Sequence, residues 1–125
     1  MGVKVVGIVG SYRKGKTIDS AVTAVLEGAE AKGAETKKIY LLDEHIEFCT
    51  NCRSCMQEKV EARRGKCVHD DDMEGIIMEI ENAKAVVLGA PINLGNVTAI
   101  MKRFIERLGP YFYWPGGRQW HRCSE

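Results

Sequence analysis

Four of the five cysteines of this 125-residue chain stand close together near its middle. Cys49, Cys52, Cys55 and Cys67 form the pattern C-x2-C-x2-C-x11-C within a polar connection. Thiolate sulfur is a soft ligand that suits iron–sulfur clusters and zinc. Three closely spaced thiols favour a cluster, because all-cysteine zinc sites usually consist of two C-x2-C pairs. Zinc, a disulfide and unliganded buried thiols remain the alternatives.

A second group of reactive side chains follows the first apolar segment. Residues 3–9 are rich in β-branched side chains, and after Gly10 a short polar loop leads into a helical pattern. Backbone N–H groups at such a turn, together with a helix N-terminus, favour an anion. The loop matches neither the G-x-G-x-x-G nor the G-x-x-x-x-G-K-[ST] pattern. Hydroxyl and basic side chains make it a candidate phosphate site: Ser11, Arg13, Lys16 and Thr17.

The elements that must position these groups alternate between strand and helix. Residues 3–9, 37–42 and 84–90 have the composition of buried strands. Apolar residues recur at helical spacing in three other segments. They are Ile18, Ala21, Val22, Val25, Leu26 and Ala29 in the first, Met73, Ile76, Ile77 and Ile80 in the second, and Met101, Phe104, Ile105 and Leu108 in the third. This alternation predicts right-handed crossovers and a parallel sheet.

Polar residues and glycines predict where these helices begin and end. Thr17 is expected to be the N-cap of the first helix, and Gly33 stands where a C-terminal glycine belongs. The acidic run Asp70-Asp71-Asp72 is expected at the start of the second helix, where it would complement the helix dipole. The third helix is expected over residues 98–108, after a loop at 91–96.

Composition and hydropathy exclude several classes of protein. The 18 Lys and Arg residues nearly balance the 17 Asp and Glu residues, so no net charge recruits nucleic acid. The N-terminus lacks the pattern of a secretory signal, and no apolar run is long enough to span a bilayer. We therefore expect a cytoplasmic protein without a nucleic-acid or membrane partner, whose reduced cysteines favour metal ligation over disulfides.

Three separate motifs together resemble one known family. The segment GSYRKGKT, the cysteine pattern followed by Asp71, Asp72 and Met73, and LGAPINLGNVTAIMKRFIERL are similar to iron–sulfur flavoproteins. These belong to the larger group of NAD(P)H-dependent FMN reductases. The resemblance implies an α/β, flavodoxin-like, three-layer α/β/α fold with a parallel sheet. It covers residue 3 to about residue 114.

The same resemblance implies cofactors and the residues that hold them. The first loop would bind the FMN phosphate through Ser11, Arg13, Lys16 and Thr17. The loop after the third strand would contact the flavin ring through Pro91, Ile92, Asn93, Leu94, Gly95 and Asn96. The compact cysteines Cys49, Cys52, Cys55 and Cys67 would hold a [4Fe-4S] cluster. Electrons would pass from NAD(P)H through FMN to a one-electron redox partner, and no side chain would act as nucleophile or base.

The chain differs from the resembled family mainly in its C-terminal part. Only three strands are evident, whereas a flavodoxin-like sheet has five. We therefore expect one domain over residues 1–125, lacking its C-terminal part and ending in an irregular tail at residues 109–125. The alternatives are a zinc- or cluster-stabilised binding module and an inactive remnant without flavin.

An incomplete sheet also predicts self-association. The margin of the third strand, part of the third helix at Met101, Phe104 or Leu108, and aromatic residues of the tail would be exposed to water. The aromatic residues are Tyr111, Phe112, Tyr113, Trp114 and Trp120. A homodimer or homotetramer that covers these surfaces is expected.

Overall fold

The computed structural model describes residues 2–56 and 65–112. The described sheet is parallel with the strand order β2-β1-β3: β1 (Lys4–Val9), β2 (Glu35–Tyr40) and β3 (Ala85–Gly89). The α-helices of this part are α1 (Thr17–Ala31), α2 (Met73–Glu81) and α3 (Ala99–Glu106). Short 3-10 helices are η1 (Leu41–Asp43), η2 (Ser54–Met56) and η3 (Gly109–Phe112).

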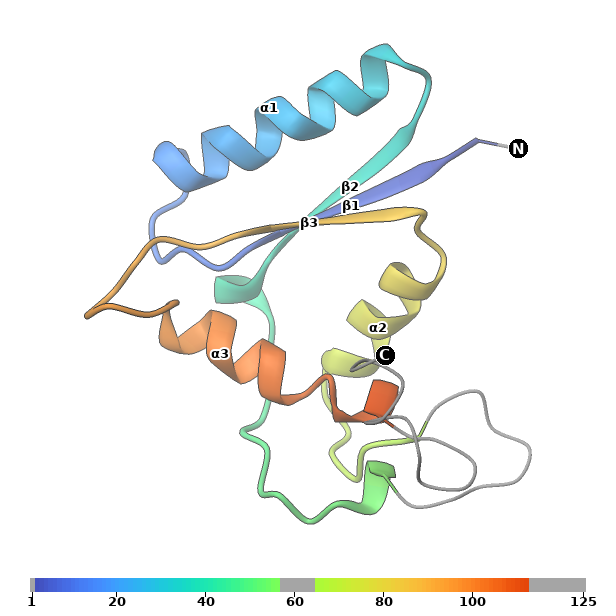
Figure 1. Ribbon diagram of the computed structural model, residues 1–125, viewed down its shortest axis with the longest axis vertical. Helices are drawn as coiled ribbons and strands as arrows, with labels where there is room; N and C mark the ends of the chain where they lie inside the picture. Colours follow the sequence, from blue (N-terminus) through green and yellow to red (C-terminus); the bar gives the residue numbers. More distant parts are fainter. Residues whose placement is uncertain (1, 57–64, 113–125) are drawn as a thin grey trace, which may run out of the picture.

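The helices lie on the two faces of the sheet. Helix α1 covers one face, and α2 and α3 lie on the opposite face (Figure 1). The strand order is that of the first three strands of a flavodoxin-like sheet. The expected three-layer α/β/α arrangement with a parallel sheet is thereby confirmed.

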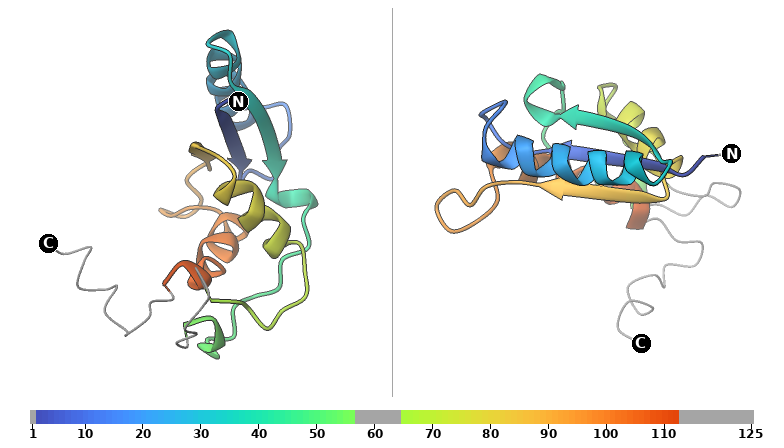
Figure 2. Two further views of the ribbon diagram at one scale, coloured as in Figure 1. Left: turned by 90° about the vertical axis from the view of Figure 1, so that its right-hand side faces the viewer. Right: turned by 90° about the horizontal axis from the view of Figure 1, so that it is seen from above.

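Strand β1 lies between the other two strands (Figure 2) and is buried on both faces because α1 covers one face of the sheet and α2 and α3 cover the other. Its alternate side chains enter two separate apolar cores. Val5 and Val9 pack in the core on the α1 side, and Val6 and Ile8 pack in the core of the opposite layer. The larger core lies between the sheet and α2 and α3, and its other members are Ile39, Leu41, Ile46, Met73, Ile76, Ile77, Met101 and Phe104.

Helix α1 packs directly on the backbone of β1. A Cβ atom at Gly7 would come within 2.7 Å of Val22 Cγ1 and 2.9 Å of Leu26 Cδ1. A glycine at this position therefore permits the close contact between helix and sheet. Val22 and Leu26 are the buried apolar residues of α1.

The second strand begins and ends earlier than the expected 37–42. It starts where Glu35 N donates to Val3 O at 2.8 Å, and it ends at Tyr40. Leu41 is fully buried but belongs to η1. The apolar pattern extends past the strand because the 3-10 turn keeps Leu41 in the core, and pattern alone does not distinguish the two conformations.

The ends of α1 confirm one expectation and correct another. Thr17 is the first residue of the helix, and the N-cap is Lys16, without a side-chain capping bond. At the other end Gly33 has φ +91°, its amide donates to Glu30 O, and Ala34 N donates to Ala29 O. These two bonds form the Schellman motif that a C-terminal glycine allows.

Not every apolar residue of the helical stripes faces a core. Met101 and Phe104 are buried, which contradicts the expectation that they would be partly exposed. Val25 is 51% exposed and Ile105 is 36% exposed, so the prediction that both face inward is wrong. Val25 lies beside the open edge of β3, where no described strand covers it.

The first four residues of the expected tail form a 3-10 helix. Residues 109–112, expected to be irregular, form η3, and Tyr111 packs against the larger core and donates its hydroxyl hydrogen to Ile77 O. Tyr113, Trp114, Trp120 and the rest of the expected tail lie outside the described residues. No helix in the described ranges is long and apolar enough to cross a membrane.

Candidate functional site

The loop after β1 and the loop after β3 meet at the carboxyl end of the sheet (Figure 1). Gly10 N donates to Gly89 O at 2.7 Å, which ties the ends of the two strands together. Thr98 Oγ1 donates to Gly10 O at 2.5 Å and accepts a bond from Met101 N at 3.2 Å, as the N-cap of α3. Fully buried Thr98 therefore joins the first loop to the start of α3.

A cavity of about 350 Å³ opens between these two loops. Its lining includes six of the residues predicted to bind FMN: Ser11, Arg13, Lys16, Thr17, Pro91 and Asn93. Tyr12 and Ile18 complete the lining. Two segments that are about 80 positions apart in the sequence thus form one candidate site, as the parallel topology predicts.

The other predicted ring contacts do not line this cavity. Asn93 and Asn96 form a bridge in which each amide donates to the other's carbonyl, at 2.7 and 3.1 Å. The residues between them, Leu94 and Gly95, both have positive φ, as in a type I′ turn. Ile92 is 81% exposed and the side chain of Leu94 is fully exposed. Ile92, Leu94, Gly95 and Asn96 therefore remain predictions based on the resemblance.

The cavity carries positive charge without a described counterion. Lys14 pairs with Asp43, whereas no ion pair involves Arg13 or Lys16 within residues 2–56 and 65–112. Ser11 Oγ accepts a bond from Arg13 N at 3.1 Å, which shapes the start of the loop. The cavity thus combines two uncompensated cations with the hydroxyl groups of Ser11 and Thr17, a set that suits an anion.

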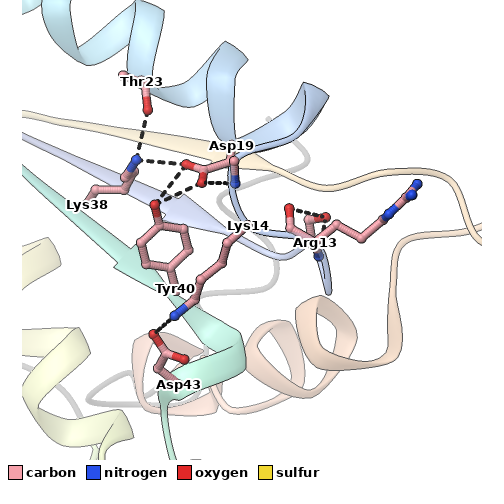
Figure 3. A network of polar contacts seen from close by, with 9 residues as sticks. Arg13, Lys14, Asp19, Thr23, Lys38, Tyr40 and Asp43 are labelled. Carbon is pink, nitrogen blue, oxygen red and sulfur yellow. Dashed lines mark hydrogen bonds and ion pairs between the residues drawn. The ribbon is translucent and has the colours of Figure 1, made fainter.

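Next to this loop, Asp19 is the centre of a polar network (Figure 3). Asp19 is 4% exposed and accepts hydrogen bonds from Gly15 N at 2.7 Å and from Lys38 Nζ at 2.7 Å. The Tyr40 hydroxyl reaches both carboxylate oxygens, at 2.9 and 3.1 Å. Lys38 also donates to Thr23 Oγ1 at 2.8 Å. The network connects the first loop to α1 and to β2.

These contacts favour the ionised form of Asp19. The hydrogen bond from Lys38 and then that from the Gly15 amide outweigh the effect of burial, and they lower the pKa of Asp19 from 3.8 to about 2. The same contact raises the pKa of Lys38. The Nζ atoms of Lys14 and Lys38 lie 4.8 and 4.9 Å from the centre of the Tyr40 ring. Tyr40 therefore contacts cations from both the loop and its own strand.

The cysteines lie in the long connection between η1 and α2, away from the first loop (Figure 1). All four predicted ligands are free thiols. Cys49 and Cys52 are exposed, and Cys55 and Cys67 are partly buried. Burial is the main cause of a raised pKa at Cys55, followed by the charges of Cys67, Cys49 and Cys52. The pKa of Cys52 is lowered, mainly by hydrogen bonds from Ser54.

The cysteine segment supplies four thiols, which is the donor set that an iron–sulfur cluster takes. Asn51 and Arg53, which separate the first three cysteines, have φ values of 56° and 62° and turn the chain sharply between them. A Cβ atom at Gly109 would lie 2.8 Å from Cys55 Sγ, so the glycine permits this thiol to pack directly against the backbone before η3. Within the described residues, no three His, Cys, Asp or Glu side chains are arranged to hold a single metal ion.

A buried ion pair joins the two ends of the segment that contains the cysteines. Arg107 contacts Asp71 through two bonds of 2.6 and 3.1 Å and donates to Glu47 O at 2.8 Å. It thereby connects the residues before Cys49 to those after Cys67. Burial acts to raise the pKa of Asp71, but hydrogen bonds from Arg107 and from the amides of Glu47 and Met73 lower it to about 2.

Arg107 also lies against one of the predicted ligands. Burial acts to lower the pKa of Arg107, but the Asp71 carboxylate and the charge of Cys67 outweigh it and raise the pKa. The Met73 amide donates to Asp71 Oδ1 at 3.1 Å, so Asp71 is also at the start of α2, as the acidic run predicted. Asp72 accepts from His45 N at 2.6 Å.

Sequence reasoning missed the roles of Asp19 and Arg107. Asp19 stands in the first turn of α1, directly after a basic loop, and that position was the available signal. Arg107 lies three residues after Phe104, where the apolar stripe of α3 would place a core residue. A charged residue at such a position indicates a buried partner, but the pattern does not identify Asp71 as that partner.

Comparisons with known proteins identify the family of this chain. A family model described as NADPH-dependent FMN reductase matches residues 3–122. An iron-sulfur flavoprotein of Archaeoglobus fulgidus is 37% identical over 113 residues, which is 90% of this chain and 49% of that protein. One of Methanosarcina thermophila is 32% identical over 105 residues, 84% of this chain and 52% of that protein. The chain thus spans about half the length of these curated relatives.

A solved structure with a similar fold also contains a flavin derivative. The crystal structure of RosB with the bound intermediate 8-demethyl-8-formylriboflavin-5'-phosphate has a TM-score of 0.62 and 17% sequence identity. The match covers 86% of this chain and 42% of RosB, and at this identity it shows the fold alone. Because the family model spans nearly the whole sequence, the chain belongs to the NADPH-dependent FMN reductase family.

Proposed function

We propose that this chain forms the FMN-binding part of an oxidoreductase that passes electrons from NAD(P)H through FMN to a one-electron acceptor. The cavity of about 350 Å³ between the loops after β1 and β3 carries this proposal. Ligands of open parallel sheets bind at the carboxyl ends of the strands. The names of the family and of the relatives support the same cofactor.

The phosphate of FMN would bind at the first loop. Arg13 and Lys16 supply charge that no described carboxylate neutralises, and Ser11 and Thr17 supply hydroxyl donors. The start of α1 adds its backbone N–H groups and the positive end of its dipole. This set distinguishes a phosphorylated flavin from riboflavin.

The flavin ring would lie against the loop after β3. Pro91 and Asn93 line the same cavity, and the bridge between Asn93 and Asn96 holds this loop in shape. When bound, FMN accepts a hydride and can release electrons singly, which is chemistry that the cofactor itself supplies. The chain's residues contribute binding and orientation.

The cysteine segment would hold a [4Fe-4S] cluster through Cys49, Cys52, Cys55 and Cys67. Four thiols within range of mutual charge effects support this ligand set. In a cluster each cysteine binds a different iron atom, so the thiols need not converge on one point. Zinc remains the alternative, and it would require them to converge.

Self-association would cover the open edge of β3. Val86 and Leu88 are 38% and 53% exposed on this strand, and Val25 of α1 is exposed beside them. An apolar groove of about 340 Å³ runs between α1 and β3. Burial of this surface contributes about 25 cal/mol per Å² to the free energy of association. We therefore infer a homodimer or homotetramer whose subunits contact one another through the edge of β3.

The FMN site is tested by titrating the purified chain with FMN. Replacement of Arg13 by alanine should weaken binding about tenfold or more, because a charge-assisted contact is lost. Lys32→Met at the far end of α1 is a control that removes a positive charge without touching the cavity. If Arg13→Ala binds FMN as tightly as the parent, the phosphate site is elsewhere. A parent that binds no flavin would favour the inactive remnant.

The metal site is tested by anaerobic reconstitution with iron and sulfide. We expect a brown protein with broad visible absorption that contains both elements, and loss of iron in Cys52→Ala. Loss in Cys52→Ala but not in Cys67→Ala would exclude only the fourth ligand. A colourless protein that contains zinc would instead support the binding-module alternative.

A further inference from the structure

We propose that Asp19 is a positioning residue for the phosphate loop, and that Lys38 of β2 neutralises its charge so that the loop can accept an anion. This inference rests on the proposed FMN site. It goes beyond that site because neither residue lines the cavity. Asp19 acts through Gly15, which lies between the cavity-lining cations Arg13 and Lys16, and Lys38 acts through Asp19.

The first step is the contact between Asp19 and the loop. Gly15 has φ +71°, a conformation that favours glycine, and its amide donates to Asp19 Oδ2 at 2.7 Å. This amide is therefore used within the protein and is not available to a ligand. Its bond to Asp19 of α1 holds the turn at Lys14 and Gly15, which lies between Arg13 and Lys16.

The second step concerns the charge of Asp19. A carboxylate that is 4% exposed and bonded to the loop would repel a phosphate group if it had no counterion. Lys38 Nζ lies 2.7 Å from Asp19 Oδ1 and cancels this charge. Tyr40 and Thr23 hold the pair in place, through bonds to Asp19 and to Lys38 respectively.

The third step explains why the loop has both paired and unpaired cations. Lys14 pairs with Asp43, just beyond β2, and lies 4.8 Å from the Tyr40 ring, so it anchors the loop to the same strand. Lys38 pairs with Asp19. Arg13 and Lys16 remain without a carboxylate partner in the described part of the chain, and both line the cavity. The anchoring cations and the ligand-facing cations are thus separate groups.

Two kinds of variant separate positioning from charge. Asp19→Ala removes the acceptor of the Gly15 amide. Lys38→Met keeps that acceptor but leaves the Asp19 charge unpaired. In the double variant Lys38→Met with Asp19→Asn, the amide oxygen can still accept from Gly15 and no charge remains. Lys32→Met is the matched control, since it makes the same substitution on an exposed residue at the far end of α1.

The readout is the ratio of the affinities for FMN and riboflavin, which isolates the phosphate contribution. Asp19→Ala and Lys38→Met should each lower this ratio about tenfold, whereas Lys32→Met should not change it. The double variant should recover most of the ratio of the parent. A merely structural defect would weaken both ligands equally and would not be rescued. Two results would overturn the proposal that Lys38 neutralises Asp19. One is an unchanged affinity ratio in Lys38→Met, and the other is a double variant whose ratio is as low as that of Lys38→Met.

A second measurement needs no ligand. Hydrogen exchange of the Gly15 amide in the free protein should be slow in the parent and in Lys38→Met, and fast in Asp19→Ala. Fast exchange in the parent would refute the positioning role even if FMN binds. If the parent does not distinguish FMN from riboflavin, the proposed phosphate site fails, and the exchange data alone decide whether Asp19 holds the loop.

Discussion

At the scale of single residues, the buried ion pair of Arg107 and Asp71 has the largest predicted effect. Arg107 is 2% exposed, and it bonds the Asp71 carboxylate and the Glu47 carbonyl. Replacing it with methionine leaves a buried carboxylate unpaired, which should lower the free energy of unfolding by about 3–5 kcal/mol. Arg107→Lys keeps the charge but cannot form both hydrogen bonds to Asp71, so the free energy of unfolding should fall by a smaller amount.

Urea unfolding followed by circular dichroism measures these differences. Lys102→Met on the exposed side of α3 is the control and should change the free energy of unfolding little. A stability of Arg107→Met equal to that of the control would show that the ion pair does not hold the cysteine segment to α3.

A second prediction at this scale concerns pH. The folded-state pKa of Asp19, about 2, lies below its ordinary value of 3.8. Its contribution to stability is therefore complete above about pH 4 and is lost as the pH falls toward 2. Asp19→Asn should lose less stability than the parent between pH 4 and pH 2. Unfolding curves across this range check the sign, and equal slopes for the two proteins would contradict it.

At the scale of elements, the substitution of two glycines tests how closely α1 packs against the sheet. Gly7→Ala would place a Cβ atom 2.7 Å from Val22 Cγ1, so α1 must move, and we expect a loss of about 1–3 kcal/mol. Gly28→Ala lies within α1, where nothing is within 4 Å of the new Cβ atom. It should increase stability by up to about 1 kcal/mol, because alanine favours helix.

Thermal unfolding of the two variants distinguishes these effects. Both add the same methyl group, so the opposite signs depend only on position. Equal changes in the melting temperature would mean that α1 does not pack on β1 at Gly7.

At the scale of the whole molecule, the proposed self-association depends on the open edge of β3. Leu88→Lys places a charge on the apolar surface that is proposed to meet a neighbour, so a dimer or tetramer should dissociate toward the monomer. Val3→Lys, at an exposed position of the N-terminal segment, is the control. Sedimentation velocity at micromolar concentration measures the change. A parent that sediments as a stable compact monomer would refute the proposed assembly.

Much of the fold and part of the candidate site were predictable, because both depend on short-range patterns. The periods of apolar residues predicted the parallel strands and their helices, and the residue types of the first loop predicted an anion-binding turn. The resemblance to iron–sulfur flavoproteins added the loop after β3 to the same site. The cavity brings Arg13, Lys16, Pro91 and Asn93 together as expected. The residue types did not reveal that Leu94 would lie in a turn that points its side chain into solvent.

The sequence by itself determined the order of strands and helices, the spacing of the cysteines and the chemistry of the first loop, because each depends on residues near one another in the chain. Only the tertiary structure decided which charges pair. Asp19 meets Lys38 and Tyr40, and Arg107 meets Asp71, across 19 to 36 positions. Such partners are selected by packing and by the need to neutralise buried charge, and no local period encodes that selection.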